Sequence, residues 1–227
     1  MRLVKGAICA IVGAVLMQGL TVAQAQQDAD RKVAGGGVSV KGWQGKADPN
    51  NKQGLTVNDS KFAPEGSGFH LSTGPAGVYW NPANAAKGDF TVRATFKEPK
   101  QTYNHPHPFG VFIAGSQLET DTWNMLYCVA YRDGTYTVRQ FTAGKPSQVV
   151  RKTPHEKVVK AAGPDAEVTQ EVALSVKGSR VECQVNGATV WGAEKSEVPG
   201  LSSTDGVVGI RVSHNSDVAI SNFALGK

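Results

Sequence analysis

The segment Asn104-His105-Pro106-His107-Pro108 carries the side chains best suited to chemistry in this chain of 227 residues. Each histidine precedes a proline, which disfavours helical backbone at that histidine, so we expect a stiff and extended loop. An imidazole can serve as a general acid, a general base or a metal ligand. We therefore predict His105 and His107 as catalytic residues and Asn104 as a contact to the substrate. The alternative is a rigid exposed turn that binds no ligand.

Two histidines alone make an incomplete metal site, because a zinc site takes three or four protein ligands. In a polyproline-like segment, with three residues per turn, His105 and His107 also diverge from each other. The sequence therefore predicts no metal site and no cofactor. A divalent metal stays open as an alternative.

Other polar and aromatic side chains occupy alternate positions of expected strands. If Leu126 and Cys128 face the core, Tyr127 faces the opposite way. Side chains alternate between the two faces of a strand, so Arg93, Glu182 and Gln184 would also face away from the core. Should these strands lie together in a concave sheet, they would form a polar, aromatic floor that suits sugars. In the alternative, the tyrosines point inward and belong to the core. The predicted substrate-binding residues are Trp80, Arg93, Asn104, Tyr127, Glu182 and Gln184.

The remaining sequence supplies the elements that must position these residues. Apolar and polar residues alternate in many short runs, separated by turns that contain glycine, such as Asp133-Gly134 and Asn186-Gly187. This pattern predicts antiparallel strands joined by hairpins. No run has convincing helical periodicity, so we expect an all-β fold of two packed sheets. The expected strands are 69–73, 78–80, 89–96, 110–114, 125–131, 135–141, 172–176, 180–185, 188–191, 207–212 and 218–223.

The order of several strand and turn segments resembles the 3-keto-disaccharide hydrolase domain family over residues 69 to 225. The resemblance implies a two-sheet antiparallel jelly-roll sandwich of the concanavalin A-like kind. It also implies that carbohydrate is handled on the concave sheet, with hydrolysis of a 3-keto glycoside as the activity. The segments that carry it are Gly88-Asp89-Phe90, Gly110-Val-Phe-Ile-Ala-Gly115, Asp133-Gly134, Val176-Lys-Gly-Ser-Arg-Val181, Val185-Asn186-Gly187, Gly206-Val-Val-Gly-Ile-Arg211 and Ile220-Ser-Asn-Phe223.

The first 25 residues have the pattern of a secretory signal peptide. Arg2 and Lys5 precede an uncharged apolar run from residue 6 to residue 20, and Ala23-Gln24-Ala25 forms an A-x-A cleavage site. The run is shorter than the roughly 20 apolar residues that span a bilayer, which disfavours the alternative of a membrane anchor. We expect export to the periplasm or the extracellular space, a flexible leader over 26–37 and a single domain over 38–227.

Cys128 and Cys183 are the two cysteines that remain after the predicted cleavage. Both lie on the apolar side of an alternating run. An even number of cysteines in an oxidising compartment permits one disulfide. Two buried free thiols are the alternative, because sequence does not show whether the residues meet.

The formal net charge is +5, and the predicted loss of Arg2 and Lys5 with the signal peptide leaves a mild +3. The largest basic excess lies between Lys145 and Lys160. A nucleic-acid surface is usually more basic and interleaved with aromatic residues. We therefore expect no nucleic-acid partner and interpret this stretch as a solvated loop or a lysine-protected edge strand.

These observations favour an exported, carbohydrate-active β-sandwich that hydrolyses or cleaves a 3-keto glycoside, with a carbohydrate as the expected ligand. The alternatives are a non-catalytic module that binds carbohydrate or another envelope component, and a purely structural envelope protein. The sequence leaves the sugar and the oligomeric state open.

Overall fold

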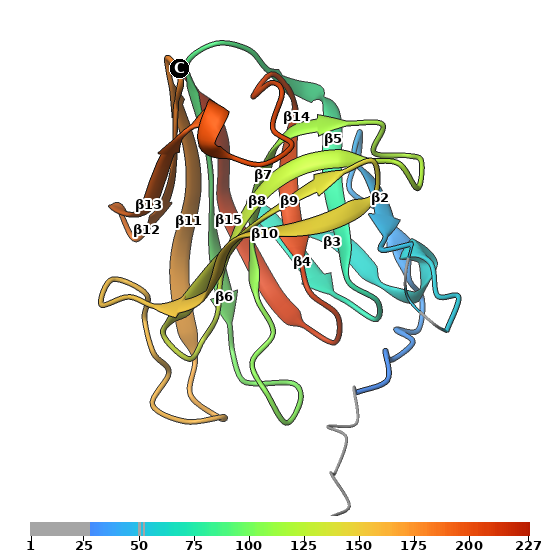
Figure 1. Cartoon of the computed structure of the whole chain (residues 1–227). Helices are drawn as coiled ribbons and strands as arrows, with labels where there is room; N and C mark the ends of the chain where they lie inside the picture. Colours follow the sequence, from blue (N-terminus) through green and yellow to red (C-terminus); the bar gives the residue numbers. More distant parts are fainter. Residues whose placement is uncertain (1–27, 50, 52) are drawn as a thin grey trace, which may run out of the picture.

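The computed structural model describes residues 28–49, 51 and 53–227, which form two β-sheets (Figure 1). In spatial order, the eight-stranded sheet contains β1 (Gly37–Val38), β3 (Lys61–Glu65), β4 (Gly68–Ser72), β15 (Asp217–Gly226), β6 (Phe90–Glu98), β11 (Val168–Lys177), β12 (Arg180–Val185) and β13 (Ala188–Glu194). The seven-stranded sheet contains β10 (Lys145–Pro154), β9 (Thr135–Thr142), β8 (Asn124–Ala130), β7 (Phe109–Ser116), β14 (Gly206–Val212), β5 (Gly77–Ala86) and β2 (Gln44–Ala47).

Nearly all neighbouring strands pair antiparallel, as the hairpin turns predict. Over the described ranges only β1 and β3 pair in parallel. Within the described residues, the helical elements are two short 3₁₀ turns, η1 (Val57–Asp59) and η2 (Lys195–Glu197). Neither is long or apolar enough to cross a membrane. The predicted all-β fold of two antiparallel sheets is confirmed.

The main core lies between the two sheets and follows the period of two. Phe90 and Phe96 of β6 are buried, whereas Arg93 between them is exposed on the outer side of the eight-stranded sheet. In the opposite sheet, Leu126 and Cys128 of β8 point into the same core. Full burial of a Phe or Leu side chain contributes about 1.5–3 kcal/mol, so this shared interior holds the sheets together.

A disulfide between Cys128 and Cys183 crosses this core. Cys128 lies in β8 of the seven-stranded sheet and Cys183 in β12 of the eight-stranded sheet. Their Cα atoms are 6.0 Å apart, and both residues are fully buried. The bond therefore links the two layers covalently.

The seven-stranded sheet also buries apolar side chains on its outer face, the face turned away from the other sheet. We call this group the outer cluster. It is stabilised by aromatic contacts, such as that between Trp123 and Phe141 with ring centroids 5.4 Å apart. A Cβ at Gly209 would lie 2.7 Å from the Phe112 ring, so the absence of a side chain there lets this ring lie across β14. The members are Val78, Trp80, Phe112, Leu118, Trp123, Met125, Tyr127, Val129 and Phe141.

Residues 28–37, the described part of the predicted leader over 26–37, make hydrogen bonds to the sandwich. Arg31 donates hydrogen bonds to the backbone carbonyls of Thr73 and Ser216, at 2.9 and 2.8 Å. The backbone N–H of Val33 donates to Asp59. This N-terminal segment is thus fixed against the turn between β14 and β15, while residues 26 and 27 and the predicted signal peptide lie outside the described residues.

Candidate functional site

Several predicted site residues meet in one cavity of about 350 Å³ on the outer face of the seven-stranded sheet. We call it the outer-face pocket. Tyr127 of β8 contributes to its wall, and the loop between β6 and β7 brings His105 and His107 to its rim. The complete lining is His105, Pro106, His107, Pro108, Tyr127, Val129, Tyr131, Thr137, Arg139, Lys152, Arg211, Ser213 and His214.

The wall of the pocket follows from strand register. Tyr127 of β8 lies directly opposite Arg139 of β9, so both side chains share one face of the sheet. Arg211 of β14 projects onto the same face, and its guanidinium carbon lies 5.3 Å from the centroid of the Tyr127 ring. Tyr127 is only 4 % exposed as a result. It is therefore a buried support for the pocket and not the open stacking platform that the sequence predicts.

Arg211 is fixed by a carboxylate from the neighbouring part of the sheet. Its Nη2 donates to Asp48 Oδ2 at 2.7 Å, and its Nη1 donates to the other oxygen of the same carboxylate. Burial would lower the pKa of Arg211, but the charge and hydrogen bonds of Asp48 raise it, so the guanidinium stays charged. The pocket thus has a rigid cation whose charge is already balanced.

Arg139 differs from Arg211 in its pairing. Its Nε is buried and has no hydrogen-bond partner among the described residues. No ion pair joins Arg139 to a carboxylate within residues 28–49, 51 and 53–227. A buried donor without an acceptor costs about 1–3 kcal/mol, more for a charged group, so Arg139 is the pocket residue most in need of an oxygen acceptor.

Lys152 of β10 covers the other side of the pocket. Its Nζ lies 4.3 Å from the centroid of the Tyr131 ring and donates to Asp133 Oδ2 at 2.6 Å. Asp133 also accepts a hydrogen bond from the Thr135 hydroxyl at 2.5 Å. The pair holds Lys152 in place above Tyr131.

We expect Asp133→Asn to lower the free energy of unfolding near neutral pH and to leave it unchanged in acid. Burial raises the pKa of Asp133, but hydrogen bonds from Lys152 and Thr135 outweigh it and bring that pKa below 3.8. A lowered folded-state pKa stabilises the protein above about pH 4, and this stabilisation is lost as the pH falls through the folded-state value. The pair is partly exposed, so the loss at about pH 7 should stay below roughly 1 kcal/mol. Urea unfolding at several pH values measures it, and a difference from wild type that grows in acid would contradict the assignment.

Four side chains converge at the rim of the pocket in a group that we call the His–Asp cluster. Its members are Asp28, His105, His107 and His214, and their ligand atoms all lie within 4.8 Å of one another. The Nε2 atoms of His105 and His107 are 3.0 Å apart. Asp28 Oδ2 lies 3.4 Å from His107 Nε2, and Asp28 Oδ1 lies 3.5 Å from His105 Nε2. His214 Nε2 lies 4.0 Å from Asp28 Oδ1.

His107 lies at the inner side of this cluster and is only 4 % exposed. Burial is the main cause that lowers the pKa of His107, to about 4, and the charges of His214 and His105 act in the same direction against the opposing effect of Asp28. The ring is therefore neutral at physiological pH. A neutral imidazole can coordinate a metal ion, but its low pKa makes it a weak general base.

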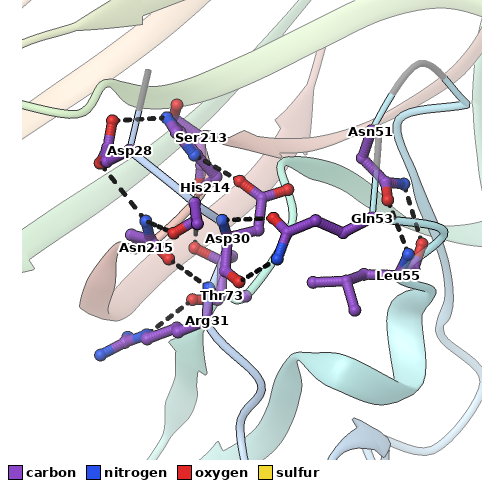
Figure 2. Close-up of polar contacts among 12 residues, drawn as sticks. Asp28, Asp30, Arg31, Asn51, Gln53, Leu55, Thr73, Ser213, His214 and Asn215 are labelled. Atoms are coloured by element: carbon purple, nitrogen blue, oxygen red, sulfur yellow. Dashed lines mark hydrogen bonds and ion pairs between the residues drawn. The ribbon is translucent and has the colours of Figure 1, made fainter. Parts of the chain in front are cut away.

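The turn between β14 and β15 connects the cluster to the N-terminal segment. Figure 2 shows Asp28, Asp30 and Arg31 packed against His214 and Asn215 of this turn. Asn215 donates through Nδ2 to the backbone carbonyl of Ala29 at 3.0 Å and accepts from the backbone N–H of Arg31 at 2.8 Å. Asn215 has φ 51°, a left-handed conformation that asparagine tolerates better than most residues. The turn thereby positions His214 and Asp28 together.

The structure separates the other predicted binding residues from the pocket. Arg93, Glu182 and Gln184 belong to the eight-stranded sheet, so the floor predicted to unite them with Tyr127 does not exist. Glu182 instead accepts a hydrogen bond from Arg180 at 2.9 Å and from Gln184 at 3.3 Å. The alternation along each strand correctly predicts that these side chains point away from the core. The outer faces of the two sheets, however, lie on opposite sides of the sandwich, so these residues do not meet Tyr127.

Trp80 and Asn104, two predicted substrate-binding residues, do not belong to the lining of the outer-face pocket. Trp80 is 3 % exposed within the outer cluster, and it lines a separate cavity of about 630 Å³ beside β2. Asn104 is exposed, and its Oδ1 accepts a hydrogen bond from His105 Nδ1 at 2.7 Å. Asn104 thus orients a histidine and does not line the pocket.

The comparisons with known proteins support the fold. The sequence matches no protein-family model, and no curated protein matches it. Among solved structures, the chain is similar to the carbohydrate-binding module CBM66 from Bacillus subtilis, with a TM-score of 0.58 and 13 % identity over 82 % of this chain and 96 % of that one. It is also similar to a Bacillus subtilis protein of unknown function with a galectin-like fold, with a TM-score of 0.51 and 15 % identity over 82 % of this chain and 90 % of that one. The chain therefore has the fold of a two-sheet jelly-roll sandwich of the concanavalin A-like kind.

Proposed function

We propose that the protein binds a carbohydrate in the outer-face pocket. The observation that carries the proposal is the combination of aromatic rings and oriented donors around one cavity, with Tyr131 and Arg139 in its wall. Sugars present C–H faces that pack on rings and oxygens that accept hydrogen bonds from planar donors. The volume of about 350 Å³ is at the lower end of the range of roughly 300–1,000 Å³ usual for small-molecule sites.

The unpartnered Nε of Arg139 defines what the ligand must offer. A hydroxyl, a carbonyl or a carboxylate oxygen at this place would give the guanidinium its missing acceptor. The similarity to a carbohydrate-binding module agrees with the same class of ligand. Because the jelly-roll fold alone is compatible with many functions, the pocket carries the proposal.

Hydrolysis of a 3-keto glycoside is the more specific form of the proposal. The observation that favours it is the position of His105 and His107, whose rings lie at the rim of the same pocket. A ketone oxygen is a suitable acceptor for Arg139. In this form the protein acts on its substrate after export, in the periplasm or outside the cell, as the signal-peptide pattern predicts.

Replacement of Arg139 by Met is expected to weaken saccharide binding about 10- to 100-fold. Met keeps the unbranched apolar part of the side chain and removes the charged donor, whose hydrogen bonds contribute about 1.5–3 kcal/mol. Calorimetric titration with a panel of ordinary and 3-keto disaccharides measures the change, and detection of free monosaccharide in the same samples reports cleavage. Arg93→Met, on the outer side of the other sheet, is the matched control and should bind like wild type.

The outcomes separate the two forms. Binding without product release supports a binding module, whereas release of a 3-keto sugar supports a hydrolase. Wild-type protein that binds no saccharide of the panel, or equal losses in Arg139→Met and Arg93→Met, would overturn the proposal.

A further inference from the structure

We propose that the His–Asp cluster is a binding site for a divalent transition-metal ion, with zinc as the metal to test. Three of the five histidines of the chain and one aspartate contribute to it. They come from three separate segments, namely the N-terminal segment, the loop between β6 and β7, and the turn between β14 and β15. The proposal does not depend on carbohydrate binding in the adjacent pocket.

The spacing of the ligand atoms agrees with coordination of one ion. A tetrahedral zinc site with bonds of about 2.0–2.1 Å has neighbouring ligand atoms about 3.3–3.4 Å apart. In the cluster, Asp28 Oδ2 and Oδ1 lie 3.4 and 3.5 Å from the Nε2 atoms of His107 and His105. The Nε2 atoms of these two histidines are 3.0 Å apart, and His214 Nε2 is 4.0 Å from Asp28 Oδ1. With one ligand atom from each residue, all four atoms lie within 4.8 Å of one another, so the side chains would move closer together around a bound ion.

The outer hydrogen bonds turn Nε2 of two of the three rings, His105 and His214, toward the cluster. His105 Nδ1 bonds Asn104 Oδ1, which can only accept, so Nδ1 carries the proton and a neutral His105 has its lone pair on Nε2. His214 Nδ1 bonds the Asp30 carboxylate at 2.6 Å, which assigns its lone pair to Nε2 in the same way. A carboxylate or amide oxygen behind a histidine is the usual support of a metal ligand.

The buried carboxylate of this cluster also has no Lys or Arg partner. Asp28 has a side chain only 3 % exposed, and among the ion pairs of the described residues it contacts histidines and no Lys or Arg. A buried carboxylate is stable only beside a positive charge or hydrogen-bond donors. A bound divalent ion would supply that charge.

The ligand set selects the class of metal. Imidazole nitrogens favour zinc, copper, nickel and related ions, whereas magnesium and calcium prefer oxygen ligands. Four protein ligands are typical of a structural site that joins segments of a chain. We therefore expect the ion to fasten the N-terminal segment to the two loops at the rim of the pocket.

Metal binding can be measured on untagged protein after chelation and dialysis. Calorimetric titration with zinc should give one ion per chain. At a zinc concentration of about one hundred times the dissociation constant, the melting temperature should rise by roughly 5–10 °C. Elemental analysis of protein purified without chelator reports which metal it carries.

Variants of the cluster separate ligands from supports. Asp28→Ala and His214→Ala should abolish stoichiometric binding, and Asp30→Asn should weaken it about 10- to 100-fold because it orients His214. His155→Ala removes a histidine outside the cluster and should bind zinc like wild type. Circular dichroism checks the fold of every variant. The proposal is overturned if wild-type protein binds no zinc stoichiometrically or if folded Asp28→Ala and His214→Ala bind it as wild type does.

Discussion

Removal of the disulfide by the double change Cys128→Ala and Cys183→Ala is expected to lower the free energy of unfolding by about 2–5 kcal/mol. The bond joins residues 55 positions apart, and a cross-link over a loop of that size lowers the entropy of the unfolded chain by an amount equivalent to about 4 kcal/mol. It also ties the two sheets through the core. A domain of this size should lose roughly 5–20 °C of melting temperature.

Thermal unfolding of the oxidised wild type, the reduced wild type and the double variant measures this effect. The reduced protein and the variant should both melt well below the oxidised protein. Mass spectrometry after alkylation without reductant provides the control for the bond itself. Two alkylated thiols in the untreated protein, or equal melting temperatures in all samples, would contradict the account.

Asp48→Asn is expected to cost about 2–4 kcal/mol of stability. Arg211 is 7 % exposed, and the Asp48 carboxylate is the negative partner that holds it in place. Removal of the Asp48 charge leaves the buried Arg211 guanidinium uncompensated in a medium of low polarity. Because Arg211 lies over the Tyr127 ring, the pocket should distort as well.

Denaturant unfolding of Asp48→Asn and wild type at neutral pH tests this expectation. Asp121→Asn is a suitable control, because the Asp121 side chain is 75 % exposed and pairs with Lys46 at the surface. The control should change stability by less than about 1 kcal/mol. If the two variants are equally stable, Asp48 does not have the role that the geometry gives it.

The strand pattern of the sequence predicts most of the fold. Each of the eleven expected strands overlaps a strand of the structure, because alternation of apolar and polar residues reflects a sheet with one buried face. The strands not expected are short or polar, as in β1, β2 and β3. β10 contains lysines and prolines and lies at an edge of the seven-stranded sheet, which agrees with the lysine-protected edge considered for residues 145 to 160.

The candidate site is only partly predictable, because its residues are distant in sequence. The His105-Pro-His107 loop stands out by composition, and the alternation in β8 turns Tyr127 outward. Asp28, however, lies 187 positions before Asn215, with which it shares a hydrogen bond, in a polar segment that has no strand pattern. No local signal connects it with His214. The alternation of side chains along β9 and β14 places Arg139 and Arg211 on the outer face. Whether they share a sheet depends on the order of the strands, which the alternation does not determine.

A crystal structure of the protein soaked with disaccharides, including a 3-keto disaccharide, tests the central claim most directly. The account predicts a saccharide in the outer-face pocket with an oxygen within hydrogen-bond distance of Arg139 Nε. A saccharide seated on the outer side of the eight-stranded sheet near Arg93 and Glu182, or a pocket without saccharide at saturating concentration, would contradict it.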